Sequence, residues 1–592
     1  MLSGRKVLLC CAAIAAMILV IGHSLEMPVW LLAAEVLATI LGLFLFGSFK
    51  YQIHKNPFTY GMLLIILATF VRLRTSEWRI EIARGGVWLW VQHHLLSFSG
   101  LDEMFHADTM LFILGLTFFV SVMAQTRLLE EVTLFLLRVF NGATLPTVIS
   151  VTAVVAFASG IFSGVAMIGL TIRTLLIVLL LAAAPTSAIR YAVMVCTTVT
   201  TICGIWLAYG EPPNLIMKAN LHPYLNDMFF LRYCGPAAVA SYLVIAWHLR
   251  RKLGNPKINL EEMDVIDANA GVVRFLQASR HGEVLSSIEL IQDHAGQLAG
   301  KSDRLLERLR GGESLGLALA RESVPEAMRK KLLGHFVSEE LADSLDRHYV
   351  LDAAGDVEGA LDAEQSVDTV LAALSLVRNR AQKFGAFSLI PFIGLLILHA
   401  FYQNVPLFLA SFAGFFAALL GIGHLHRMRA LAMREAINEY AEYYFLFPLF
   451  LSITLLTNAG FFNKIQDLIH HGIAVLGNAH VATAQFYGCT FLSSILDNNV
   501  VADFASRGLY GLNLGVLHLF ALAQIAGYAL GGCWTHIGSA QSVVAFAFIQ
   551  REVDEHFTPV QWIKEMTPVI LGVLFVLTVL IYIESAILAW VR

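Results

Sequence analysis

The sequence predicts an all-α polytopic membrane protein in which two similar halves flank a soluble helical insert. Three observations lead to this fold class: the composition, a series of apolar segments of membrane length, and a repeated pattern of polar breaks. Hydrophobic residues make up 57% of the chain and charged residues 14%, and the mean hydropathy is +0.69. Soluble domains carry about 25% charged residues, so we expect the chain to be embedded in a lipid bilayer.

Apolar segments of membrane length form two series, since a membrane helix needs roughly 20 mostly apolar residues. The first series covers residues 7–22, 28–48, 57–72, 107–124, 144–160, 165–184, 188–209 and 230–249. The second covers 385–401, 404–422, 440–457, 480–496, 512–530 and 568–590. Short or broken segments lie near 131–140, 161–166, 205–217, 465–477, 498–510 and 538–549. Together they predict about 12–14 membrane crossings.

Basic residues suggest the orientation of these segments. Arg5 and Lys6 precede the first apolar segment, which we interpret as a membrane helix rather than a signal peptide, because the run is long, no A-x-A cleavage site follows and a second apolar segment comes at once. The positive-inside rule then favours a cytoplasmic N-terminus and a cytoplasmic loop 49–56. The sequence HLRRKLG at 248–254 places the start of the insert on the same side. The four arginines within 72–84 fall outside by simple alternation, so that segment is interfacial or re-entrant, or the number of crossings differs by one.

A charged insert separates the two series. Residues 251–384 contain 17 Lys or Arg and 22 Asp or Glu, and their apolar residues recur at helical spacing. The insert contains no nucleotide-binding loop, metal cluster or nucleophile motif. It is expected either to bind a cytosolic partner as a regulatory domain or to act as a spacer. The net charge of −4 argues against a nucleic-acid partner.

The chain therefore divides into four parts. They are N-terminal membrane helices (1–100), a first transporter repeat (101–250), the soluble helical insert (251–384) and a second transporter repeat (385–592). The seven cysteines lie in apolar segments without metal-binding spacing, which is typical of buried thiols.

The first sign of duplication is a pair of short polar stretches. ASGIFSGVA at 158–166 aligns with LSSILDNNV at 492–500, at an offset of 334 residues. The alignment pairs Ser159 with Ser493 and Ser163 with Asp497.

A second pair follows in the same order. GIWLAYGEPPNLI at 204–216 aligns with GCWTHIGSAQSVV at 532–544, at an offset of 328. This alignment pairs the residues Trp206 with Trp534, Gly210 with Gly538, and Asn214 with Ser542. Upstream, 108–132 resembles 442–465. Three matches in one order indicate an internal duplication.

Each half also contains two candidate helix breaks, at 159–164 and 210–214 and at 493–499 and 538–542. Within hydrocarbon every backbone amide must be paired, so a helix can break only where protein or water supports it. Matching breaks in two halves are typical of secondary transporters, because exposed helix ends bind ions.

At these breaks the sequence resembles the ion transporter superfamily, which includes arsenite permeases, NhaD-type sodium–proton antiporters, citrate–metal transporters and divalent-anion symporters. SSILDN at 493–498, GEPPN at 210–214 and THIGSAQS at 535–542 carry the resemblance. It covers both membrane halves, but neither the N-terminal region nor the insert. It implies two inverted repeats, each with a re-entrant hairpin and an interrupted helix. FSG at 162–164 departs from the family, since many members repeat an Asp-Asn there, which makes a symmetric two-site mechanism doubtful.

Polar residues in the breaks are the candidate site. A charge at mid-bilayer costs about 2.5–3.5 kcal/mol or more, so an ionisable residue at that depth is expected to have a function. Asp497 and Asn498 offer oxygen ligands suited to sodium. The predicted ion- or substrate-binding residues are Asp497, Asn498, Glu211, Asn214, Ser493, Ser163, Ser542, Asp503 and Thr200.

Structural alternatives stand beside several of these roles. Glu211, Asn214 and Ser542 can act as helix caps. Asp503 can pair with Arg507, four residues further on. Thr200 can bond within its own helix.

With this resemblance, the leading expectation is a sodium–proton antiporter of the bacterial inner membrane, in which one carboxylate binds either Na⁺ or H⁺. Its partners would be these ions, the bilayer and a second copy in a homodimer; neither a cofactor nor enzymatic activity is expected. One alternative is a symporter or permease for an anion or carboxylate such as arsenite, citrate or a dicarboxylate, with Lys218 near the break. Another is a transporter-like sensor whose insert is the output domain.

Overall fold

The computed structural model describes most of the chain. The described residues are 4–21, 27–48, 55–73, 77–126, 128–162, 164–182, 184–258, 287, 290–292, 294–298, 300–310, 313–334, 339–402, 405–422, 426–441 and 443–591. Within these ranges the secondary structure is helical, apart from two isolated bridges. The chain is an all-α polytopic membrane protein.

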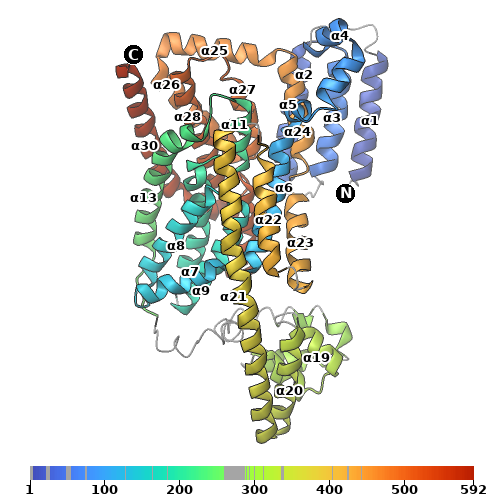
Figure 1. Ribbon diagram of the computed structural model, residues 1–592, viewed down its shortest axis with the longest axis vertical. Helices are drawn as coiled ribbons and strands as arrows, with labels where there is room; N and C mark the ends of the chain where they lie inside the picture. Colours follow the sequence, from blue (N-terminus) through green and yellow to red (C-terminus); the bar gives the residue numbers. More distant parts are fainter. Residues whose placement is uncertain are drawn as a thin grey trace.

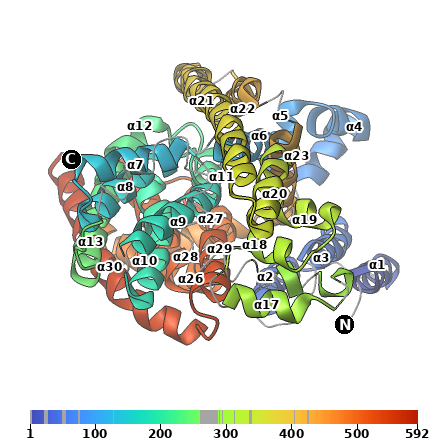
Figure 2. The ribbon, with the colours of Figure 1, turned by 90° about the horizontal axis from the view of Figure 1, so that it is seen from below.

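Five helices form an N-terminal group on one flank of the bundle, opposite α13 and α30 (Figure 2). They are α1 (Gly4–Ile21), α2 (Val29–Ser48), α3 (Lys55–Val71), α4 (Glu77–His94) and α5 (Phe98–Phe105). Helices α4 and α5 lie at the end remote from the insert (Figure 1). Helix α4 is bent at Gly86, whose φ of 82° is left-handed. The arginine-rich segment thus continues into a bent helix that is not among the apolar helices of membrane length in the described chain.

The first half of the bundle follows. Its elements are α6 (Ala107–Gln125), α7 (Leu128–Val139), α8 (Thr144–Ser159), α9 (Gly164–Leu181), α10 (Thr186–Thr201), η1 (Cys203–Trp206), α11 (Pro212–Asn220), α12 (Asp227–Phe229), the π-helix η2 (Phe230–Cys234) and α13 (Gly235–Lys252).

The insert forms a separate helical lobe with its own apolar core below the membrane bundle (Figure 1). Its elements are η3 (Ala295–Gln297), α17 (Ser302–Arg310), α18 (Leu315–Arg321), α19 (Glu326–Leu333) and α20 (Glu339–Ala354). Helix α21 (Val357–Phe401) then runs unbroken for 45 residues from the lobe into the bundle. The boundary that we placed at residue 384 falls inside this helix.

The second half begins beside α6. Its elements are α22 (Phe408–Ile422), α23 (His426–Ala441), α24 (Leu446–Asn458), α25 (Phe461–Leu476), α26 (Asn478–Ile495), α27 (Asn498–Arg507), α28 (Leu514–Trp534), α29 (Ala540–Phe548), the π-helix η4 (Ile549–Val553) and α30 (Pro559–Val591).

The helices differ in whether they are long enough to cross a membrane. In the described residues, seven helices have the length and composition to cross a membrane, and five further apolar helices are 10–17 residues long. Two of the short helices, Thr144–Ser159 and Met167–Leu176, lie on either side of the first hairpin break.

The two halves are inverted relative to each other. Helix α7 lies near the end that carries the insert, whereas α25, its counterpart before the second hairpin, lies along the opposite end (Figure 1). The same aromatic contact occurs in both halves: Phe157 packs on Trp206 at 4.7 Å between ring centroids, and Phe491 packs on Trp534 at 5.7 Å. The sequence alignment pairs Trp206 with Trp534, and Phe157 and Phe491 directly precede the first pair of aligned stretches.

Two glycines allow the same close approach in both halves. Gly210 lies against the carbonyl oxygen of Ser159, and Gly538 lies against that of Ser493. In the first half, backbone hydrogen bonds of 3.0 Å run from Gly210 N to Gly160 O and from Gly164 N to Gly210 O. The tip of each hairpin is therefore held against the break of the next helix.

Candidate functional site

Four interruptions lie at matching places in the two halves. The hairpin breaks separate α8 from α9 after Ser159 and α26 from α27 at 496–497, as expected from the sequence. The other two breaks cover 207–211 and 535–539, three residues before the predicted ranges 210–214 and 538–542. The reason is local, because Pro212 occupies the first turn of α11 and the Ser539 side chain caps α29, so both helices resume earlier.

Side chains from the two halves bond to each other between these breaks. Gln541 Nε2 on α29 donates to both carboxylate oxygens of Glu211, at 2.8 and 3.0 Å. Tyr528 on α28 donates its hydroxyl to Asn214 Oδ1 at 2.6 Å. All four side chains are buried. The fold thus brings Glu211 and Asn214, separated from their partners by more than 300 residues, into one polar layer.

Asp497 forms the N-terminal end of α27. Its Oδ1 accepts hydrogen bonds from the backbone N and the Nδ2 of Asn499, at 2.9 and 2.7 Å. It also interacts electrostatically with Glu211. Asn498 instead lies beside Gly532 on α28. The amide next to Asp497 in the site is therefore Asn499 rather than the predicted Asn498.

A first cavity, here called the inner cavity, has a volume of about 530 Å³. It opens among α6, α9, α23 and the breaks before α27 and α29. Its polar lining comes from Ser121, Glu435, Glu439, Tyr443, Asp497, Asn499 and Ser539. Helices α9 and α23 extend toward the end of the bundle that carries the insert (Figure 1).

A second cavity, the outer cavity, has a volume of about 410 Å³. Helices α5, α11 and α21 contribute to its wall, and the end of α21 involved is the one remote from the insert. Its charged or titratable lining residues are Asp102, Glu103, His106, Asp108, Lys218, His222, Asp227, His399, Arg507 and Tyr510.

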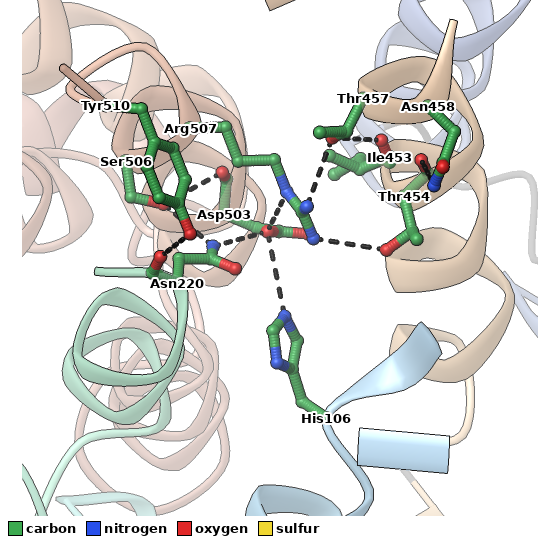
Figure 3. Close-up of polar contacts among 10 residues, drawn as sticks. All are labelled: His106, Asn220, Ile453, Thr454, Thr457, Asn458, Asp503, Ser506, Arg507 and Tyr510. Atoms are coloured by element: carbon green, nitrogen blue, oxygen red, sulfur yellow. Dashed lines mark hydrogen bonds and ion pairs between the residues drawn. The ribbon is translucent and has the colours of Figure 1, made fainter. Parts of the chain in front are cut away.

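Helix α27 connects the two cavities. Asp497 and Asn499 line the inner cavity at its first turn, and Arg507 lines the outer cavity at its last turn. Asp503 lies between them and is completely buried. It bonds to Arg507 Nε at 3.0 Å and to Asn220 Nδ2 on α11 at 2.7 Å (Figure 3).

Arg507 extends this buried cluster to α24. Its Nη1 and Nη2 donate to Thr457 and Thr454 on α24, at 3.1 and 3.2 Å (Figure 3). His106 Nε2 lies 4.0 Å from Asp503 Oδ1. His106 joins α5 to α6 in a left-handed conformation, with φ 55° and ψ 54°. The cluster therefore ties α6, α11, α24 and α27 together where the two cavities are separated.

The remaining predicted residues lie around this layer. Ser493 Oγ donates to Tyr528 O and Ser542 Oγ donates to Gly532 O, both at 2.8 Å. Thr200 bonds to the carbonyl oxygens of its own helix and lines neither cavity. Ser163 lies outside the described residues.

Two further charged residues that line the outer cavity, Lys218 and Asp108, have structural partners. Lys218 donates to Asp227 Oδ1 at 2.8 Å and to the hydroxyl of Tyr209 at 3.1 Å. Asp108 accepts from the backbone N of Leu407 and Phe408 at the start of α22, at 3.0 and 3.1 Å. The Lys218 ammonium group is thus already neutralised beside the outer cavity.

Sequence reasoning missed Gln541, Tyr528 and Glu439 as members of the site. Gln541 lies in THIGSAQS, one of the motifs that carry the family resemblance. Its place in this motif, near the start of a helix, could have identified it as a site residue. Tyr528 and Glu439 lie in apolar or amphipathic helices without a motif, and only the packing of α28 and α23 against the breaks brings them to the site.

Comparison with known proteins gives one match. A family model described as a citrate transporter matches residues 12–513, which includes the first half, the insert and the second half as far as α27. No curated protein sequence matches the chain.

Proposed function

The chain belongs to the citrate transporter family, part of the ion transporter superfamily, and on this premise we propose that it carries a citrate-like carboxylate together with a cation by alternating access. It is a secondary transporter rather than an enzyme. The family favours the carboxylate alternative over the sodium–proton antiporter that we expected first.

The observation that carries this proposal is that three helix N-termini line the inner cavity. Val165 is the second residue of α9, Asn499 is the second residue of α27, and Ser539 with Ala540 begins α29. Each helix N-terminus carries roughly half a positive charge from its aligned backbone dipoles, which attracts anions. A volume of about 530 Å³ falls within the range of small-molecule sites, about 300–1,000 Å³.

The same wall supports coupling to a cation. Asp497, Glu435 and Glu439 bring up to three negative charges to the inner cavity, against about 1.5 positive charges from the three N-termini. An anionic substrate therefore enters favourably only when protons or metal cations neutralise part of this charge. We assign the cation to Asp497, because Asp497 and Asn499 both line the inner cavity beside the three helix N-termini.

We expect the contacts within the polar layer to change during transport. Glu211 and Gln541 join the two halves directly, so movement of one half against the other must break or carry this contact. The Asp503–Arg507 cluster closes the path to the outer cavity in this state. Arg507 is the cation best placed to receive a carboxylate when the outer cavity opens, since a guanidinium binds carboxylates in a bidentate manner.

Uptake of labelled citrate by proteoliposomes tests the proposal. Citrate should accumulate when a proton or sodium gradient is imposed, and Asp497→Asn should lower gradient-driven uptake by at least about tenfold. Asp467→Asn, an exposed aspartate on α25, is the matched control and should transport normally.

The antiporter predicts a different outcome. If wild-type vesicles take up no carboxylate, but Na⁺ collapses an imposed proton gradient, the symport proposal is wrong and the antiporter is correct. If Asp497→Asn shows normal coupled uptake, the cation lies elsewhere.

A further inference from the structure

A cluster of donor atoms lies outside the transport path, on the bent helix α4. Glu81, His93 and His94 direct donor atoms to one point, all within 4.8 Å of one another. His94 Nε2 lies 3.0 Å from Glu81 Oε2 and 3.5 Å from His93 Nδ1, and His93 Nδ1 lies 3.9 Å from Glu81 Oε1. Two ring nitrogens and a carboxylate converge in this way around a shared proton or a cation.

These spacings fit a tetrahedral zinc ion. Zinc binds histidine nitrogen at about 2.0–2.1 Å and carboxylate oxygen at about 2.0–2.2 Å, so neighbouring ligand atoms lie about 3.3–3.6 Å apart. The three measured distances scatter about this value. Two imidazoles and one carboxylate also bind zinc in preference to magnesium or calcium, which favour oxygen ligands.

The surroundings of His94 resemble a second coordination shell. His94 is 3% exposed and packs against Trp78 and Trp90, with ring centroids 5.7 and 5.1 Å apart. Its Nδ1 is buried without a hydrogen-bond partner in the described residues and lies 3.7 Å from Glu103 Oε2. A metal-bound histidine usually directs its other nitrogen at such a carboxylate, which fixes the ring.

The other two ligands leave room for a fourth. The side chains of His93 and Glu81 are 63% and 45% exposed, so water or a solute can complete the coordination. We propose that Glu81, His93 and His94 form a zinc-binding site on the face of the protein remote from the insert. Zinc bound there fastens α4 to α5 through the His94–Glu103 contact, and Glu103 lines the outer cavity. The site does not depend on the substrate transported.

Metal titration of the purified full-length protein tests this site. After removal of metal with a chelator, Co²⁺ should give the visible absorption of a tetrahedral complex at one equivalent per chain, and Zn²⁺ should displace it. Glu81→Gln and His94→Ala should weaken Zn²⁺ binding by at least about tenfold, and Glu103→Gln by about 10- to 100-fold. His93→Ala should do the same, and its exposed side chain can be removed without disturbing the packing.

The protein contains a matched control. His470 and His471 form another adjacent pair, exposed on α25 at the same end of the molecule. The double substitution to alanine there should leave Zn²⁺ affinity and stoichiometry unchanged. If the wild type shows no saturable binding of Zn²⁺ at one equivalent, if His93→Ala binds as tightly as the wild type, or if the control loses binding equally, the proposal is wrong.

Discussion

Substitution of the glycines at the interrupted helices tests the proposed architecture most directly. Gly210 and Gly538 each lie where the hairpin tip of the same half touches the break. An added methyl group at either position must push the hairpin tip away from the interrupted helix. We therefore expect Gly210→Ala and Gly538→Ala to impair transport, and Gly210→Ala to do so more strongly.

The structure gives the magnitude. A Cβ atom on Gly538 would lie 2.6 Å from Ser493 O, whereas such atoms essentially never approach within 3.0 Å, so a shift of at least about 0.4 Å is needed. Overpacking of this kind costs about 1–3 kcal/mol, which corresponds to a loss of about 30-fold at the middle of the range. On Gly210 the Cβ atom would overlap Ser159 O itself. The required shift then also breaks two backbone hydrogen bonds and moves Glu211, and misplacement by about 1 Å can cost about 100-fold.

Citrate uptake in proteoliposomes and thermal stability in detergent are the two measurements. Gly488→Ala is the control, since it lies inside α26 and its Cβ atom would meet nothing within 4 Å. Alanine at a helix interior is favoured over glycine by about 1 kcal/mol, so this control should be as stable as the wild type or more stable. If Gly210→Ala transports as well as Gly488→Ala, or if Gly538→Ala is more severe than Gly210→Ala, the inferred contact does not control transport.

Two further predictions concern charged groups. Arg507→Met leaves the buried carboxylate of Asp503 without its cation and should destabilise the protein by about 3–5 kcal/mol. The double variant Asp503→Asn/Arg507→Met removes both charges and should recover most of the thermal midpoint. Equal midpoints for Arg507→Met and the wild type would contradict this reasoning. In the insert, the hydrogen bond from Arg308 lowers the pKa of Glu322 below its ordinary value of 4.5, so the stability that it provides is present above that pH and is lost as the pH falls through the lowered pKa. Hydrogen exchange of α17 and α18 in the full-length chain, corrected for intrinsic rates, should rise on acidification, and Glu322→Gln should remove this dependence.

The sequence was most informative where the chemistry is local. Apolar runs predicted the membrane helices, and the paired motifs predicted the hairpin breaks. The offsets of the other two breaks by three residues have one cause, because Pro212 and Ser539 start their helices before Asn214 and Ser542, the polar residues that marked the two motifs. At the candidate site, Glu211 and Asn214 lie in the polar layer, and Asp497 lines the inner cavity and interacts electrostatically with Glu211. Thr200 lines neither the inner nor the outer cavity, and its hydroxyl donates to carbonyl oxygens of its own helix.

Contacts between distant segments required the structure. Nothing around Glu211 in the chain indicates that Gln541 bonds to it, and nothing around Arg507 indicates the threonines of α24. The bend of α4 at Gly86 brings the carboxylate of Glu81 close to His93 and His94, which the sequence did not indicate.

By itself, the sequence determined that this protein lies in a membrane, that its halves are repeated and that its helices break at polar motifs. These properties follow from hydrophobicity, helix propensity and capping, which act over a few residues. The tertiary structure alone decided which polar groups meet, how α27 joins two cavities, and which amide accompanies Asp497. The physical reason is that buried polar groups must find partners, and in an inverted repeat those partners lie in the other half, about 300 residues away.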